Sequence, residues 1–224
     1  MDGFFSGYGS INDILIDAAI IAVPALVCIT IHELAHGYIA YRLGDNTAKQ
    51  MGRLTLNPIK HIDLIGLIMI LLVRFGWAKP VPVNMRNFKH PKWYMAITAI
   101  AGPLSNIILA AIVILVDVFL PTETPHIVEI IVRRMASLSI ILAVFNLLPI
   151  PPLDGSKVLF SLLPNDKYNN LMRYERFGMI IIIALLFSGS FLGFDFFSSI
   201  VIAPAEAIFF NIHEFFRSTL IYSS

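Results

Sequence analysis

The sequence predicts an all-α polytopic membrane protein with four to five transmembrane helices and a short re-entrant segment that carries an extended edge. Of its 224 residues, 57% are hydrophobic and 14% are charged, and the mean hydropathy is +0.78. A soluble domain of this length cannot hide so much apolar surface, whereas several spanning helices require it. We expect one integral-membrane domain over residues 1–224, with a core at about 14–165 and C-terminal helices at 176–220.

The first two apolar stretches differ in length. Residues 14–43 are long enough for a spanning helix, whereas residues 64–77 are too short. Fourteen helical residues rise about 21 Å, which is less than the roughly 30 Å of hydrocarbon in a bilayer. Gly66, Gly76 and the Lys79-Pro-Val-Pro82 run also disfavour a long regular helix. We therefore expect 64–77 to be re-entrant, followed by extended backbone around 77–84.

Three later stretches, 93–120, 135–150 and 177–197, are expected to span the membrane. A last stretch, 200–220, is amphipathic because polar and charged residues interrupt it. Two interpretations of this last stretch stay open, a spanning helix and a helix lying at the interface.

The distribution of basic residues predicts the orientation in the cell membrane. Nine of the sixteen Lys and Arg residues fall between the first and third stretches, and the segment before the first stretch has none. By the positive-inside rule, the N-terminus lies outside and the 42–92 region is cytoplasmic. Arg133 and Arg134 depart from this pattern, and they either line a polar cavity or reach the outer headgroups. A net charge of +1 without a basic cluster argues against a nucleic-acid partner. The apolar composition predicts the lipid bilayer as a partner.

A metal-binding pattern lies near the end of the first stretch. His32 and His36 are one helical turn apart, so both imidazoles can reach one zinc ion. Glu33 stands between them, close enough to act on a metal-bound water as acid/base catalyst. Ionisable residues inside a spanning helix are costly and usually mark a functional site. We expect one Zn²⁺ per chain.

The third protein ligand is expected after the fourth stretch. If 64–77 does not span, the end of the fourth stretch and His36 lie on the same side of the bilayer. That end carries Asp154, preceded by three prolines that unwind the helix and followed by Gly155, which we expect to permit an unusual backbone angle. This placement favours Asp154 as a ligand over a simple surface turn, and it puts the active site toward the cytoplasm.

The motif at 32–37 and the run from Asn146 to Gly155 together resemble the site-2 protease family of intramembrane zinc metalloproteases, in its compact prokaryotic form without a PDZ domain. The resemblance implies His32, His36 and Asp154 as zinc ligands and Glu33 as catalytic acid/base. It also implies that the substrate is a transmembrane protein cleaved within or near its membrane segment. Further similarity to the family lies in Gly52 to Pro58 with His61 and Asp63, in Trp77 to Asn84, and in Ala101 to Asn106.

Two further site assignments are predicted. The Asn146 side chain is a candidate donor to the oxyanion, with hydrogen bonding to the broken helix end as an equal alternative. Val81, Val83 and Asn84 lie on the predicted extended edge, where an unwound substrate could add as a strand.

Two other functions stay open at this stage. A membrane metal transporter or channel would use the same His/His/Asp set for ion transit, but it has no particular need for Glu33. An inactive scaffold typically loses a ligand or the glutamate, and this chain retains all four.

The predicted orientation can be tested by thiol labelling in a Cys28→Ser background. Single cysteines at Ser10 and Thr122 should react with an impermeant reagent added outside intact cells, because positively charged segments stay in the cytoplasm. Cysteines at Asn46 and Asn165 should react only after permeabilisation. Labelling of position 165 from outside would separate Asp154 from the histidines.

Overall fold

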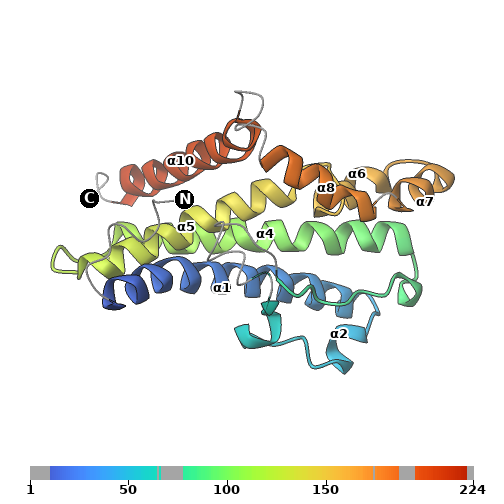
Figure 1. The fold of residues 1–224 in the computed structure, drawn as a ribbon, viewed down its shortest axis with the longest axis horizontal. Coiled ribbons are helices and arrows are strands. Elements are labelled where there is room, and N and C mark those ends of the chain that lie inside the picture. Colours follow the sequence, from blue (N-terminus) through green and yellow to red (C-terminus); the bar gives the residue numbers. More distant parts are fainter. Residues whose placement is uncertain (1–10, 65, 67–77, 174, 187–194, 221–224) are drawn as a thin grey trace.

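The computed structural model describes residues 11–64, 66, 78–173, 175–186 and 195–220 (Figure 1). Across these ranges the regular elements are helices, as the sequence predicted. The predicted re-entrant stretch at 64–77 lies almost entirely outside the described residues, as does part of the stretch at 177–197. Helices long and apolar enough to cross a membrane, by length and composition, are found among the described residues at Ala19–Arg42, Pro91–Val118 and Ser198–Leu220.

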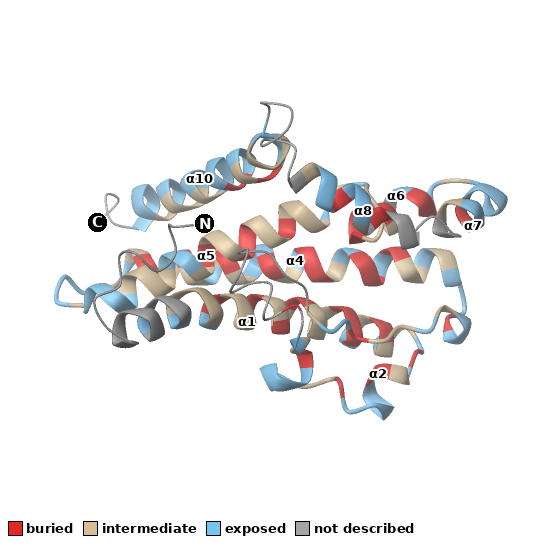
Figure 2. Cartoon of the chain, in the orientation of Figure 1, coloured by how far each residue is buried: buried red, intermediate tan, exposed pale blue. Residues whose placement is uncertain are grey.

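Three long helices form the body of the molecule. They are α1 (Ile11–Arg42), α4 (Pro91–Val118) and α5 (His126–Asn146), and α4 packs against both of the others (Figure 1). Buried residues follow the faces that these helices turn toward one another, whereas α10 (Ala203–Leu220) is largely exposed (Figure 2).

Helix α4 shows why the bundle suits a membrane. Its buried positions include Ala99, Gly102, Asn106 and Ala110, spaced three or four residues apart and mostly small. Small residues let helices approach closely where lipid supplies no hydrophobic drive for helix association. The opposite face exposes large aliphatic side chains at Ile97, Ile100, Leu104, Ile108, Ile112 and Val116. Such a stripe fits contact with lipid tails.

The core of the bundle lies away from the polar motifs. Ala110, Ile114, Ala136, Ile140 and Ala205 are almost fully buried and join α4, α5 and α10. At the end of α4 beyond this core, the buried carboxylate of Asp117 accepts from Arg133 Nε at 3.1 Å and lies 3.6 Å from His213 Nε2. Arg133, which departed from the charge pattern, thus has an ion-pair partner on the neighbouring helix.

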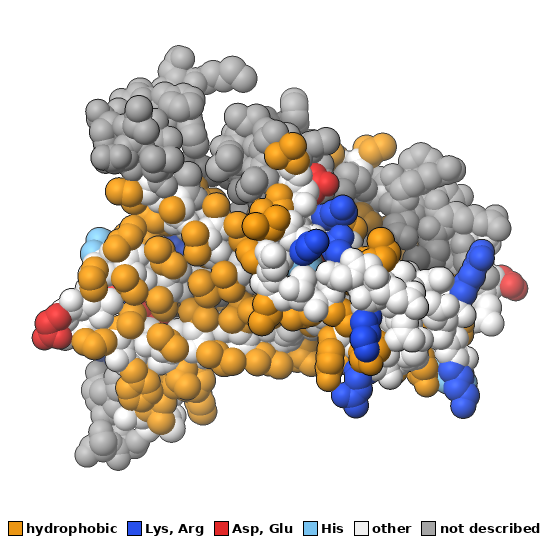
Figure 3. All heavy atoms as spheres, turned by 90° about the horizontal axis from the view of Figure 1, so that it is seen from below, with side chains coloured by type: hydrophobic (Ala, Val, Ile, Leu, Met, Phe, Trp, Pro, Cys, Tyr) orange, Lys and Arg blue, Asp and Glu red, His pale blue; other side chains and the backbone are white. Residues whose placement is uncertain are grey.

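Short elements connect the long helices at the other end of the bundle. Helices α2 (Thr47–Gln50), η1 (Pro58–His61) and η2 (Met85–Asn87) follow α1, while α6 (Asp154–Ser161), α7 (Asn165–Arg173) and α8 (Glu175–Leu186) follow α5. A π-helical turn, η3 (Ser198–Ile202), leads into α10. In the face seen in Figure 3, hydrophobic side chains cover one end and Lys and Arg side chains gather toward the other.

The side chain of Asp45 ties two of the connecting segments together. It is fully buried, and its carboxylate accepts from Thr47 N and Oγ1, from Asn84 N at 2.6 Å and from Asn87 Nδ2 at 2.7 Å. Burial opposes ionisation, but these hydrogen bonds favour the charged form more strongly and hold the pKa of Asp45 below its usual value. The carboxylate therefore fixes residues 84–87 against the end of α1.

Asp45→Asn should destabilise the protein at neutral pH by about 1–3 kcal/mol, because several bonds to a charged acceptor are weakened. The folded pKa is lower than the unfolded one, so the contribution of Asp45 is present above the unfolded pKa of about 3.9 and is lost as the pH falls through the folded pKa. Thermal unfolding in detergent from pH 7 to pH 3 should show the difference between wild type and variant shrinking. A difference independent of pH would contradict an ionised Asp45.

Candidate metal centre

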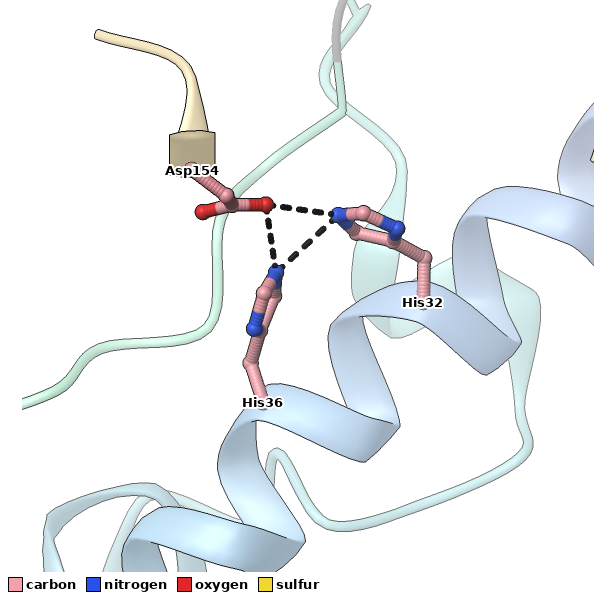
Figure 4. A group of neighbouring side chains, drawn as sticks. All are labelled: His32, His36 and Asp154. Atoms are coloured by element: carbon pink, nitrogen blue, oxygen red, sulfur yellow. Dashed lines mark hydrogen bonds and ion pairs between the residues drawn. The ribbon is translucent and has the colours of Figure 1, made fainter. Parts of the chain in front are cut away.

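Helix α1 presents two imidazoles to one point. His32 and His36 lie one turn apart, are both buried, and bring their Nε2 atoms to 3.0 Å from each other (Figure 4). The spacing of four residues places both rings on one helix face, as the sequence predicted.

Asp154 reaches the same point from a distant part of the chain. It is the first residue of α6, and its Oδ2 atom lies 3.2 Å from His32 Nε2 and 3.0 Å from His36 Nε2 (Figure 4). The expectation of an unusual backbone angle at Gly155 was wrong, because the described glycines with positive φ are Gly44 and Gly52. Gly155 serves a close approach instead, since a Cβ there would lie 2.1 Å from the Leu147 carbonyl oxygen.

The three donor atoms fit a tetrahedral metal ion. Ligands about 2.0–2.1 Å from zinc stand about 3.3 Å apart at the corners of a tetrahedron, close to the separations here. The ring of His36 also has a suitable tautomer, because its Nδ1 lies 2.7 Å from the Thr98 carbonyl oxygen and must donate to it. Nε2 of His36 then carries a lone pair directed at the shared point.

Asn106 of α4 supports the second imidazole. It is fully buried with its Nδ2 3.3 Å from His32 Nδ1, while its Oδ1 has no partner among the described residues. A half turn of the amide places Oδ1 where it accepts a hydrogen bond from the Nδ1–H of His32, which leaves the His32 Nε2 lone pair for a metal. Sequence reasoning placed Asn106 in a run that resembles the family but did not link it to His32.

Lys157 is a site residue that sequence reasoning missed. Its Nζ lies 3.3 Å from Asp154 Oδ1, the oxygen that faces away from the histidines, and the side chain is largely buried. The ion pair leaves Oδ2 to face the two imidazoles. The sequence did contain an indication of this contact, because Lys157 follows Asp154 by three residues and a helix brings side chains at that spacing to one face.

Glu33 lines a cavity of about 500 Å³ together with His32, His36 and Asp154. Residues from four parts of the chain line this cavity: α1, the 78–84 segment, α4, and the region from α5 to α8. The Oε2 atom of Glu33 accepts the backbone N–H of Val81 at 2.7 Å. The Glu33 carboxylate, three donor atoms spaced as zinc ligands would be, and this cavity therefore meet at one place.

Of the remaining predicted site residues, three line this cavity and Asn84 does not. Asn146 and Val83 line it together with Val81. The Asn146 amide donates to the Leu142 carbonyl oxygen at 2.9 Å, so it also closes the end of its own helix. The backbone N–H of Asn84 donates to Asp45, and its side chain caps η2. A role of these residues toward substrate stays a prediction.

A helical membrane bundle with a buried His/His/Asp centre and an adjacent glutamate defines the class of membrane metalloproteases. The model of Peptidase family M50 matches residues 124–189, which include Asp154. "Putative zinc metalloprotease YwhC" of Bacillus subtilis is 41% identical over 172 residues, which cover 74% of this chain and 78% of that protein. "Putative zinc metalloprotease Rip2" of Mycolicibacterium smegmatis is 27% identical over 72% of this chain and 64% of its own length. No solved structure shows a significant match.

The chain belongs to Peptidase family M50, the site-2 protease family. It is an intramembrane zinc metalloprotease, as the resemblance implied, and the His-His-Asp cluster is consistent with its zinc. The alternative of a metal transporter is not favoured.

Gly102→Ala should weaken zinc binding strongly. A Cβ at this position would stand 2.4 Å from His36 Nε2 and 2.7 Å from His32 Cε1, so both rings must turn away. Ser105→Ala, one turn along α4, removes only a bond to the helix backbone and should retain zinc. Metal content of the purified proteins, with chelator competition, checks this, and full zinc retention in Gly102→Ala would contradict the placement of the rings.

Proposed function

We propose that His32, His36 and Asp154 hold one zinc ion and that Glu33 is the catalytic acid/base in cleavage of a transmembrane protein substrate. The observation that carries this proposal is the convergence of three buried donor atoms, all within 4.8 Å of one another, beside a cavity that Glu33 also lines. Zinc, when bound, acts as a Lewis acid that activates water for attack on a peptide carbonyl.

The protein residues supply the remaining chemistry. Glu33 accepts a proton from the attacking water and returns it to the leaving amine. Contacts with Lys157, Thr98 and Asn106 keep the ligand atoms oriented. Asn146 lines the cavity, and rotation of its amide away from the Leu142 carbonyl would let it donate to the oxyanion.

The substrate is proposed to bind as an extended chain beside the 78–84 segment. A helical membrane segment must unwind before its peptide bonds are accessible, so helix-breaking residues should favour cleavage. Val81 and Asn84 already donate their N–H groups to Glu33 and Asp45. Among the described residues no acceptor contacts the Val83 N–H, so this amide is the best candidate for a bond to substrate.

We propose that the chain forms a single catalytic domain over 1–224, with its catalytic core at about 14–165. The N-terminus is outside, and the active site faces the cytoplasm. The gathering of Lys and Arg side chains toward one end of the molecule supports this orientation (Figure 3).

Replacement of the ligands and of Glu33 separates metal binding from turnover. Ala at His32, His36 or Asp154 should lower zinc content and abolish cleavage, whereas Glu33→Gln should keep zinc and lose about 10²-fold or more in rate. Zinc is measured by atomic emission. Cleavage is measured on a tagged single-span reporter whose membrane segment contains a Gly-Pro pair.

Two results would contradict the proposal. Full zinc content in Asp154→Ala would remove that carboxylate from the ligand set. A fully active Glu33→Gln enzyme would exclude Glu33 as acid/base.

A further inference from the structure

Among the described residues, the motif from Gly52 to His61 makes no hydrogen bond to His32, His36 or Asp154, and it folds into a compact support for the 78–84 segment. Gly52 has a φ of +64°, which lets the chain turn directly before Arg53. His61 is buried, and its Nε2 lies 2.9 Å from the Thr55 carbonyl oxygen, closing the loop on itself. Residues 52–61 therefore form a preformed loop, which we call the bracket.

The bracket holds the 78–84 segment by its backbone. Arg53 is buried, and its Nη2 donates to the Lys79 carbonyl oxygen at 2.7 Å and to that of Pro80 at 3.3 Å. The N–H of Lys79 donates to the His61 carbonyl oxygen at 2.9 Å. A buried guanidinium is costly unless it is hydrogen-bonded, so these carbonyl groups and Arg53 stabilise one another.

The same segment presses on the helix face that carries Glu33. Val81 is buried, and a Cβ on Gly37 would lie 2.8 Å from Val81 Cγ1 and 2.6 Å from Leu54 Cδ2. Gly37 is one turn beyond Glu33, so the bracket and the segment both pack onto this part of α1. The Val81 N–H then meets Glu33 Oε2 at 2.7 Å.

We propose that Arg53 and the Val81 backbone amide are positioning groups for Glu33, linked through the 78–84 segment. The inference rests on Glu33 as acid/base. The N–H of Val81 engages one carboxylate oxygen and fixes the side-chain rotamer, which leaves the other oxygen for proton transfer. Arg53 sets the place of that N–H by holding the two preceding carbonyl groups.

Backbone amide exchange tests the contact without any substrate. With selective ¹⁵N-valine labelling, the Val81 signal is assigned by its loss in Val81→Ala. Its exchange with deuterium should be slow in the wild type and about tenfold or more faster in Glu33→Ala and in Arg53→Ala. The Asn84 amide, followed with ¹⁵N-asparagine, donates to Asp45 and should keep its rate in Glu33→Ala. An unchanged exchange rate of the Val81 amide in Glu33→Ala would overturn this proposal, even if Glu33 is the acid/base in hydrolysis.

Kinetics on the tagged reporter separate positioning from substrate binding. Val81→Pro removes the N–H and should lower kcat about 10–100-fold with KM and zinc content unchanged, because small misplacement of a catalytic group is costly. Val81→Ala keeps the N–H and shortens only the buried side chain, so its kcat should stay well above that of Val81→Pro. A raised KM with unchanged kcat in Val81→Pro would mean that this amide serves substrate instead, and would overturn the proposal.

A double-mutant cycle tests whether Arg53 acts through the same contact. Arg53→Ala should lower kcat with zinc retained, and the Arg53→Ala/Val81→Pro protein should be about as active as Val81→Pro alone. Fully multiplicative losses would show that Arg53 acts independently of the Val81 amide. A Glu33→Gln enzyme with wild-type activity would instead refute the proposed function, so the two failures are distinguishable.

Discussion

Two imidazoles and a carboxylate share one buried point, and the rest of the structure is arranged to make this possible. Polar side chains inside a membrane protein are costly unless each is paired. Every nitrogen or oxygen of the cluster that does not face the shared point has a protein partner: Thr98 for His36, Asn106 for His32 and Lys157 for Asp154. The partners orient the donors as well as satisfying them, which is what a metal centre requires.

These residues can come together because glycines, which have no Cβ, stand where the helices approach most closely. Gly102 lets α4 lie against the two rings, and Gly155 lets α6 begin directly on the end of α5. Gly178 of α8 makes a similar approach, since a Cβ there would be 1.7 Å from the Pro151 carbonyl oxygen. Close backbone contact replaces hydrophobic burial as the means by which helices in lipid hold a fixed geometry.

Hydrogen bonds to its backbone, and not side-chain packing alone, hold the 78–84 segment beside the metal centre. Three side chains, Glu33, Asp45 and Arg53, bind main-chain groups between residues 79 and 84. A segment expected to offer a free edge thus has several of its polar groups in use. Its prolines at 80 and 82 carry no N–H, so between residues 79 and 84 the Val83 N–H is the one without a hydrogen-bond acceptor among the described residues.

Local patterns in the sequence determined the helical membrane class, the approximate helix ranges and the pairing of His32 with His36. Each of these follows from composition or from a periodicity within a few residues, which the helix imposes directly. The meeting of Asp154 with these histidines was inferred from topology, and the structure places it within 3.2 Å of them. Local patterns did not reveal Lys157 as its partner, the contact of Asn106 with His32, or the reason for Gly155. Those features arise where segments far apart in the chain touch, and only the tertiary packing of α1, α4, α5 and α6 decides which atoms meet there.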